Sequence, residues 1–211
     1  MRGRLEMSTV AIIDYGLCNL DSIARAVEEC GGNPRITSNP KDLSTAGHVI
    51  LPGVGAFDKA MHNLAELNFV DAIKEESEKR QVPILGICLG MQLLADSSTE
   101  NKKTTGLGLI SADVIRLTPG TSTERVPHIG WNEVVAKNDT PLFRGIDSGK
   151  DFYFVHSYHV SCNRENVSAT TPYCGGFVSA IERDTVFGVQ FHPEKSQRVG
   201  FSLLKNFLKI G

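Results

Sequence analysis

The stretch Val82-Pro-Ile-Leu-Gly-Ile-Cys88-Leu-Gly-Met-Gln92 decides the fold of this chain. Its first half is an apolar run that predicts a buried strand, and residues 89–95 have a helical composition. Cys88 stands between them with a glycine two residues away on each side, a pattern typical of a nucleophile on a sharp strand-to-helix turn. There the sulfur would face the first amides of the helix, which favours the reactive thiolate. Taken alone, the motif is equally compatible with a buried apolar cysteine.

Strand and helix patterns alternate through the first half of the chain. Strands are predicted over 10–15 and 48–53, a helix over 20–30, and a helical region over 57–80 that breaks near Asn68. Three successive β-α repeats imply a parallel, doubly wound sheet, which binds its ligands at the carboxyl ends of the strands. Gly53 and Cys88 both fall at such ends.

The second half has a different character. Short strands, some of them antiparallel, are predicted over 108–117, 131–136, 151–156, 167–170, 177–182 and 186–191, followed by an amphipathic helix over 197–210. No linker or internal repeat divides the chain. We therefore expect one α/β domain over 9–211, with a mostly parallel doubly wound sheet plus antiparallel strands, preceded by an N-terminal extension over 1–8.

Composition narrows the function. The chain has 211 residues, a net charge of −2 and no basic stripe, which argues against nucleic acid as the main partner. No apolar run approaches the ~20 residues that span a bilayer, and the N-terminus lacks the apolar segment of a signal peptide. The five cysteines lack the spacing of a disulfide framework or a metal site and fit a reducing compartment. We expect a cytoplasmic protein without metal or cofactor.

A thiol nucleophile needs a base and a group that orients the base. The segment Gly188-Val-Gln-Phe-His192-Pro-Glu194 offers both, because His192 follows a predicted strand and Glu194 can project in a similar direction. A carboxylate bonded to one ring nitrogen fixes the tautomer and raises the basicity of the other. An isolated His-Pro-Glu is more often a surface turn; downstream of the cysteine motif, the catalytic interpretation is favoured.

Leu51-Pro-Gly53-Val54-Gly55 follows the second long strand. Its glycines let backbone N–H groups approach a developing negative oxygen, and with the Leu89 amide they would form an oxyanion hole. By itself the segment is more often an ordinary glycine-rich turn. It is not a dinucleotide fingerprint, because the third glycine is missing.

Together, Gly86-Ile-Cys88-Leu-Gly-Met-Gln92 and Phe191-His192-Pro-Glu194 resemble the class I (triad) glutamine amidotransferases, over about residues 9–209. Further segments are similar to the glutaminase subunits of imidazole glycerol phosphate synthase: Ile13-Asp-Tyr-Gly16 with Asn19-Leu20, and residues 52–57, 127–132 and 154–158. One departure is visible. The family usually has glycine where Cys18 stands, so the first loop is expected to differ locally.

The resemblance implies a flavodoxin-like fold and a role for each motif. Cys88 would attack the carboxamide carbon of glutamine, His192 would carry the thiol proton to the departing ammonia, and Glu194 would orient His192. The oxyanion hole would be lined by Gly53, Val54 and Leu89. The amino-acid end of glutamine would be held by Gly55, Gln92, His156, Ser157 and Tyr158. The partner would be met by Trp131, Asn132 and Lys195.

The resemblance also implies a partner. Ammonia would pass to a (β/α)₈-barrel cyclase in a heterodimer, which acts on a phosphorylated ribulosyl aminoimidazole nucleotide. The products would be imidazole glycerol phosphate and aminoimidazole carboxamide ribotide, in histidine biosynthesis. Glutaminase activity is expected to be low without partner and nucleotide. One physical route is a Val54 peptide that points its carbonyl into the oxyanion site when idle and its N–H when active.

Other functions stay open on the motifs alone. Glutaminases of anthranilate, guanylate, cytidylate and carbamoyl-phosphate synthesis share the cysteine motif, and γ-glutamyl hydrolases share the nucleophile and base; the segments at 14–16 and 127–132 argue against them. A thiol protease or glyoxalase-like protein has little reason to carry Gln92 or the Phe-His-Pro-Glu-Lys run. A non-catalytic binding subunit would not need the triad. We assign no chemical role to His48, His62, His128 or His159.

Overall fold

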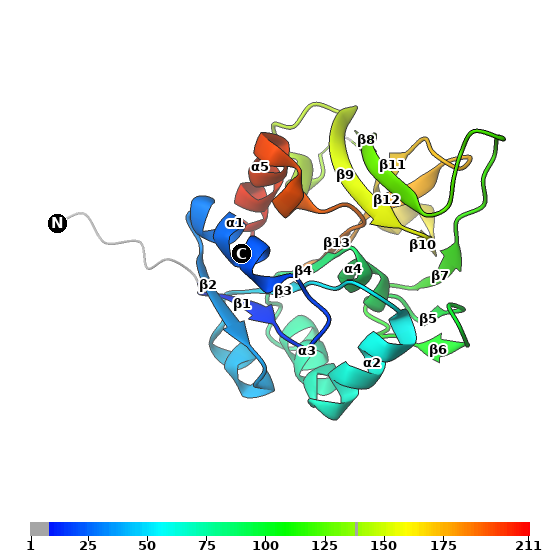
Figure 1. Cartoon of the computed structure of the whole chain (residues 1–211). Helices are drawn as coiled ribbons and strands as arrows, with labels where there is room; N and C mark the ends of the chain where they lie inside the picture. The colour runs from blue at the N-terminus through cyan, green and yellow to red at the C-terminus, as the bar shows by residue number, and fades with distance from the viewer. Residues whose placement is uncertain (1–8, 138) are drawn as a thin grey trace.

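The computed structural model describes residues 9–137 and 139–211, and the expected extension over 1–8 lies outside the described residues. Five neighbouring strands form the parallel part of the sheet (Figure 1). In spatial order they are β2 (Asn33–Thr37), β1 (Thr9–Ile13), β3 (His48–Leu51), β4 (Ile84–Ile87) and β13 (Val186–Val189).

The sheet continues from β13 into a mainly antiparallel part. In order these strands are β12 (Phe177–Arg183), β10 (Tyr158–Cys162), β7 (Ala112–Arg116), β5 (Ser97–Ser98) and β6 (Thr104–Thr105). A branch from β12 runs through β11 (Val167–Thr171) to β8 (His128–Ala136) and β9 (Lys150–His156). The predicted fold class, a parallel doubly wound sheet with antiparallel strands in the second half, is confirmed.

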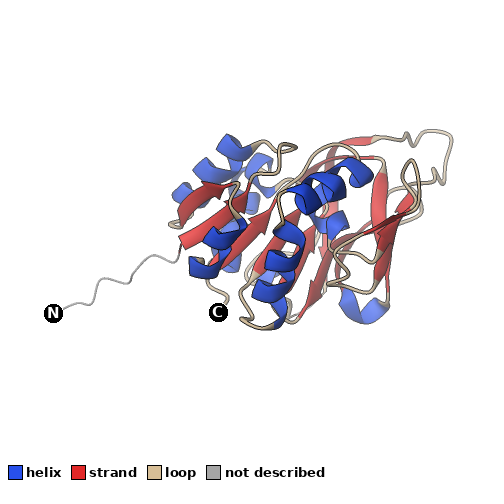
Figure 2. Ribbon diagram, turned by 90° about the horizontal axis from the view of Figure 1, so that it is seen from below, coloured by secondary structure: helices blue, strands red, loops and turns tan. Residues whose placement is uncertain are grey.

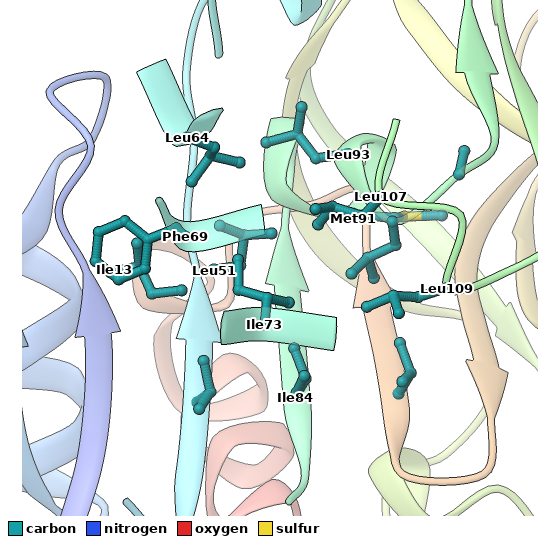
Figure 3. Close-up of a cluster of buried hydrophobic side chains, with 14 of the residues drawn as sticks. Ile13, Leu51, Leu64, Phe69, Ile73, Ile84, Met91, Leu93, Leu107 and Leu109 are labelled. Atoms are coloured by element: carbon teal, nitrogen blue, oxygen red, sulfur yellow. The ribbon is translucent and has the colours of Figure 1, made fainter. Parts of the chain in front are cut away.

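Helices cover both faces of the parallel strands (Figure 2). One face packs against α1 (Leu20–Glu29) and α5 (Gln197–Phe207), the other against α2 (Phe57–Glu66) and α3 (Phe69–Glu78). Alternate side chains of each strand enter different cores: Ile12 joins the first and Ile13 the second. Figure 3 shows the second core, where Leu64 and Phe69 meet strand residues such as Leu51.

The described elements differ from the predicted ones in places. The helical break is confirmed at Asn68, which adopts a left-handed φ of 59° between α2 and α3. The strands β2 and β10 were not predicted, and the helix after Cys88, α4 (Leu89–Leu93), is shorter than the expected 89–95. Short 3₁₀ turns occupy Pro40–Thr45, Pro141–Phe143, Arg164–Asn166 and Pro193–Lys195. Among the described residues, no helix is long and apolar enough to span a membrane.

Candidate active site

Cys88 sits on the turn between β4 and α4 in strained backbone. Its φ is 56° and its ψ is −111°, a conformation that L-residues rarely adopt and that costs about 1–3 kcal/mol. The flanking glycines are required by close approach: a Cβ at Gly86 would lie 2.6 Å from the Gly90 carbonyl oxygen, and one at Gly90 would collide with the Leu51 carbonyl. The sequence therefore forms the sharp turn that the motif predicts.

Parallel pairing of β4 with β13 brings the two motifs together. Ile87 pairs with Val189, and the Cys88 N–H donates to the Val189 carbonyl at 2.8 Å. Because both strands end at this level, the chain leaving β13 runs directly past Cys88. The His192 N–H then donates to the Tyr153 carbonyl at 2.9 Å, which anchors the imidazole beside the turn.

His192 and Glu194 form a buried pair. Nδ1 of His192 lies 2.8 Å from Oε1 of Glu194, and the two side chains are 4% and 1% exposed. A carboxylate only accepts, so Nδ1 carries the proton and Nε2 is the nitrogen that can serve Cys88. The 3₁₀ turn Pro193–Lys195 holds both residues in place.

The electrostatics of the pair favour a charged imidazole. Burial lowers the pKa of His192, but the nearby Cys88 thiol and the hydrogen bond and charge of Glu194 raise it to about 10, well above its usual range. An imidazolium beside a thiolate is the reactive form of a Cys-His pair.

Of the three residues expected to line the oxyanion hole, Val54 and Leu89 have their N–H groups engaged within the protein. The Val54 N–H donates to the Leu17 carbonyl at 2.8 Å, and the Leu89 N–H donates to the Gly53 carbonyl at 3.3 Å. The Gly53 carbonyl and the Val54 N–H are the two ends of one peptide unit. The Gly53–Val54 peptide therefore accepts the Leu89 N–H with its oxygen and points its own N–H away from the cavity, toward Leu17.

Cys88 opens onto a cavity of about 400 Å³. The cavity is lined by Val54, Gly55, Cys88, Leu89, Gln92, Glu100, Val155, His156, Ser157 and Tyr158. All five residues expected to hold the amino-acid end of glutamine are among them. Both hydrogens of the Gln92 amide are used, on the Tyr158 carbonyl at 2.9 Å and on Oε1 of Gln190 at 3.1 Å. The part of Gln92 left to meet a ligand is its Oε1, an acceptor.

Two polar residues of the site were missed by sequence reasoning. Glu100 lines the cavity, where its carboxylate is a natural partner for an ammonium group. Gln190 is fully buried with Nε2 3.7 Å from Cys88 Sγ. Glu100 lies in a polar stretch without a motif. Gln190 stands two residues before His192, which was the available local signal, but its place beside Cys88 comes from the pairing of β13 with β4.

The expected partner residues separate onto different surfaces. Trp131 is 48% exposed on β8, packs edge-on against Tyr153 with ring centroids 6.0 Å apart, and Lys195 lies 5.8 Å from the Tyr153 ring. Asn132, the next residue along β8, faces the other side of the strand and places Nδ2 3.3 Å from Nε2 of His128. Of the three, Trp131 and Lys195 share one surface, and Asn132 belongs to the interior side.

The structure also places the other histidines and cysteines considered in the sequence analysis. His48 is buried with Nε2 2.9 Å from the Ile210 carbonyl, and His62 is exposed on α2. The Cys18 thiol lies 3.7 Å from the Pro52 carbonyl, and burial, the largest influence, raises its pKa to about 11. All five cysteines are unpaired. The described residues contain no cluster of three metal-ligating side chains.

Comparison with known proteins places this geometry in a family. The family model described as "Glutamine amidotransferase class-I" matches residues 11–210. Among solved structures, PurLQS from Thermotoga maritima superposes with a TM-score of 0.71 over 95% of each chain, at 20% sequence identity. A glutamine amidotransferase structure superposes with a TM-score of 0.72 over 95% of this chain and 97% of that chain, at 18% identity. These likenesses concern the fold.

Curated relatives are much more similar in sequence. The imidazole glycerol phosphate synthase subunit HisH of Moorella thermoacetica is 49% identical over 95% of this chain and 94% of its own. HisH of Methanosarcina acetivorans is 47% identical over 97% of this chain and its own full length. HisH 1 of Campylobacter jejuni strain RM1221 is 46% identical over 95% of this chain and its own full length. The chain therefore belongs to the class-I glutamine amidotransferases and, within them, to the family of HisH subunits of imidazole glycerol phosphate synthase.

Proposed function

We propose that the chain hydrolyses glutamine to glutamate and ammonia and delivers the ammonia to a separate cyclase subunit. The observation that carries this proposal is the buried His192–Glu194 pair beside a cysteine that opens onto a cavity of about 400 Å³. The relatives named imidazole glycerol phosphate synthase subunit support the cyclase partner and a place in histidine biosynthesis.

The reaction follows from the three side chains. Cys88 Sγ attacks the carboxamide carbon as a thiolate while His192 holds the proton on Nε2. His192 gives that proton to the leaving nitrogen as the C–N bond breaks, which releases ammonia and leaves a γ-glutamyl thioester on the sulfur. His192 then takes a proton from water as its oxygen attacks the thioester, and glutamate departs. Glu194 keeps Nδ1 protonated and the ring in orientation throughout.

The oxyanion of each tetrahedral intermediate requires a rearranged peptide. Rotation of the Gly53–Val54 peptide would free the Leu89 N–H, break the bond from Val54 N–H to the Leu17 carbonyl, and turn that N–H toward the substrate. Gly53 and Gly55 flank Val54, and Gly55 has a positive φ of 106°, so glycines on both sides support a backbone that can rearrange here. An idle hole of this kind supports low activity without a partner. If the cyclase complex with bound ligand still kept the Val54 N–H on Leu17, this route would be excluded.

The exposed face of β8 and β9 is the proposed docking surface for the cyclase. Ile129, Trp131 and Val135 lie on one face of β8 and are 61%, 48% and 44% exposed. The exposed Glu133 lies between Trp131 and Val135 on this face, and Val155 extends the patch on β9. Lys195 follows the triad glutamate directly and borders the same surface at Tyr153. An apolar patch with an aromatic centre and a basic rim is typical of a protein interface.

The decisive experiment is glutamate release from glutamine by the purified chain, with and without a cyclase subunit and its nucleotide ligand. We expect partner plus ligand to activate glutamate release strongly. The Cys88→Ala variant in the same complex should release no glutamate. Full activity of the isolated chain would indicate a free-standing glutaminase or γ-glutamyl hydrolase. Absence of glutamate under every condition would refute the proposal.

A further inference from the structure

A continuous set of polar side chains lies behind the cavity and outside the Cys88–His192–Glu194 group. It centres on the Tyr158 carbonyl, which has donors on two sides: His156 Nδ1 at 2.8 Å and Gln92 Nε2 at 2.9 Å. A carbonyl oxygen only accepts, so both of these nitrogens must carry hydrogen. This one atom therefore fixes the direction of every hydrogen bond that leads away from it.

The first arm runs through two histidines that face each other across β8 and β9. Because His156 donates from Nδ1, its neutral ring accepts at Nε2, which lies 3.1 Å from His128 Nδ1. His128 must then donate from Nδ1 and accept at Nε2, where the Asn132 amide nitrogen approaches to 3.3 Å. Burial, the largest influence on both, lowers the pKa of His128 to about 4 and that of His156 to about 3, in agreement with two neutral rings.

The second arm reaches the reactive sulfur. Gln92 presents its NH₂ group to Gln190, so the atom of Gln190 that faces it, 3.1 Å away, is Oε1. Gln190 Nε2 is thereby turned toward Cys88 Sγ at 3.7 Å, as a donor to sulfur. Gln92 is 4% exposed and Gln190 is 0% exposed.

The surroundings hold the first arm rigidly. The His128 ring stacks on Tyr173 with centroids 4.1 Å apart and an interplanar angle of 22°, and Phe154 lies 4.9 Å away. Phe177 packs against the edge of His156 at 4.9 Å. Neither histidine can rotate to a different partner without disrupting this aromatic packing and leaving a buried ring nitrogen without a hydrogen bond.

We propose that His128, His156 and Gln190 are positioning residues: two hydrogen-bonded arms that meet at the Tyr158 carbonyl fix the substrate-holding Gln92 and the Cys88 thiol relative to each other. The first arm begins at Asn132, the residue after the exposed Trp131, so it also connects the geometry of the site to β8. This inference rests on the proposed glutaminase function, in which Gln92 and Tyr158 hold the amino-acid end of glutamine.

The two arms affect different kinetic constants. Loss of the first arm frees Tyr158 and Gln92, which bind the ground state of glutamine, so KM should rise more than kcat falls. Loss of the second arm removes a donor to the sulfur, which stabilises the thiolate in the chemical step, so kcat should fall with little change in KM. A purely structural role would lower stability without this division.

The first test compares His128→Phe with His128→Asn in the complex with cyclase and nucleotide. Phenylalanine keeps the stacking and removes the donor, so we expect KM for glutamine to rise about tenfold with kcat within about threefold. The Asn amide nitrogen occupies the place of Nδ1, so His128→Asn should keep KM within about twofold of wild type. Equal KM values for Phe and Asn, whether impaired or not, would overturn the first arm.

The second test uses Gln190→Glu, which keeps Oε1 for Gln92 and replaces the donor to sulfur by an acceptor. We expect kcat to fall about tenfold with KM within about twofold, and alkylation of Cys88 by iodoacetamide at pH 7, followed by peptide mapping, to slow by a similar factor. Unchanged kcat and alkylation would overturn the second arm. Alkylation of Cys88 does not require glutamine turnover, so it tests the second arm even in an inactive protein. An inactive wild-type complex would refute the glutaminase function alone.

Discussion

At the residue scale, the hydrogen bonds and packing around each proposed catalytic side chain leave its reactive atom a single role. His192 has Nδ1 bonded to Glu194 at 2.8 Å, which leaves Nε2 for the proposed proton transfer. Cys88 is held at a φ of 56° by the glycines around it, which turns the sulfur toward the cavity. In each case the neighbouring residues determine the function of the side chain, and a different neighbour would change it.

Glu194→Gln tests the orienting carboxylate. The substitution keeps shape but removes the negative charge that raises the pKa of His192, and it permits the wrong tautomer. We expect kcat for glutamate release in the activated complex to fall about 10²–10⁴-fold, with KM nearly unchanged. Steady-state kinetics measure this, and circular dichroism checks that the fold is intact. A folded variant with near-wild-type kcat would show that His192 does not depend on Glu194.

Sequence reasoning reached the residues whose motifs are local. The cysteine turn and His-Pro-Glu were readable because spacing within a few residues dictates their geometry. Gln190 was not predicted because its role comes from the parallel register that pairs Ile87 with Val189, a long-range fact. The donor role of His128 was missed for the same reason: its partner His156 lies on the facing strand.

At the element scale, the turn between β4 and α4 depends on backbone contact. Gly90→Ala would place a methyl group against the Leu51 carbonyl of neighbouring β3, which cannot move aside cheaply. We expect a loss of about 2–3 kcal/mol in the free energy of unfolding, measured by urea denaturation. Gly145→Ala is the comparison: its Cβ meets nothing within 4 Å, so only strain at its left-handed φ of 73°, about 1 kcal/mol, should appear. Equal losses of unfolding free energy in the two variants would show that the contact between residue 90 and the Leu51 carbonyl does not limit stability.

The pairing of β8 with β9 buries two neutral histidines and should make stability depend on pH. Burial depresses the pKa of His128 to about 4 and of His156 to about 3, against about 6.5 in the unfolded chain. Below pH 6.5 the unfolded state binds more protons, so this stability is complete above pH 6.5 and is lost as the pH falls toward 4 and 3.

His128→Asn removes one of these two groups. The free energy of unfolding of both proteins should fall when the pH is lowered from 7.5 to 5.5. The fall should be about 1.4 kcal/mol smaller for the variant, which is the contribution of one proton taken up on unfolding. Urea unfolding at the two pH values measures the difference. Identical losses would mean that the His128 ring is not held neutral in the fold.

Strands with a strong apolar run were predictable, and strands at polar edges were not. β4 and β13 are buried throughout and read as continuous hydrophobic segments. β2 is an edge strand with Pro34 and mostly exposed residues, so its sequence resembles a loop. β10 follows β9 after the single residue Ser157, and the predicted strand over 151–156 ended with β9, so β10 was missed.

At the scale of the whole molecule, the site and the proposed docking surface are two sides of one structure. The parallel strands carry Cys88 and the chain to His192 at their carboxyl ends, and β8 and β9 stand beside that edge (Figure 1). β9 passes from the exposed patch at Val155 directly to the cavity residue His156. A partner bound to the patch would therefore contact a strand that lines the cavity.

Trp131→Ala tests that arrangement. An exposed aromatic at the centre of an apolar patch is a typical interface hot spot, so we expect the substitution to weaken cyclase binding by about 2 kcal/mol, or about 30-fold in Kd, by calorimetric titration. Ile36→Ala is the matched control, because Ile36 is 42% exposed on β2 at the far edge of the sheet. At saturating cyclase, the Trp131 variant should recover glutamate release, since it contributes no atom to the cavity. If both variants bind with wild-type affinity, the cyclase docks on a different surface.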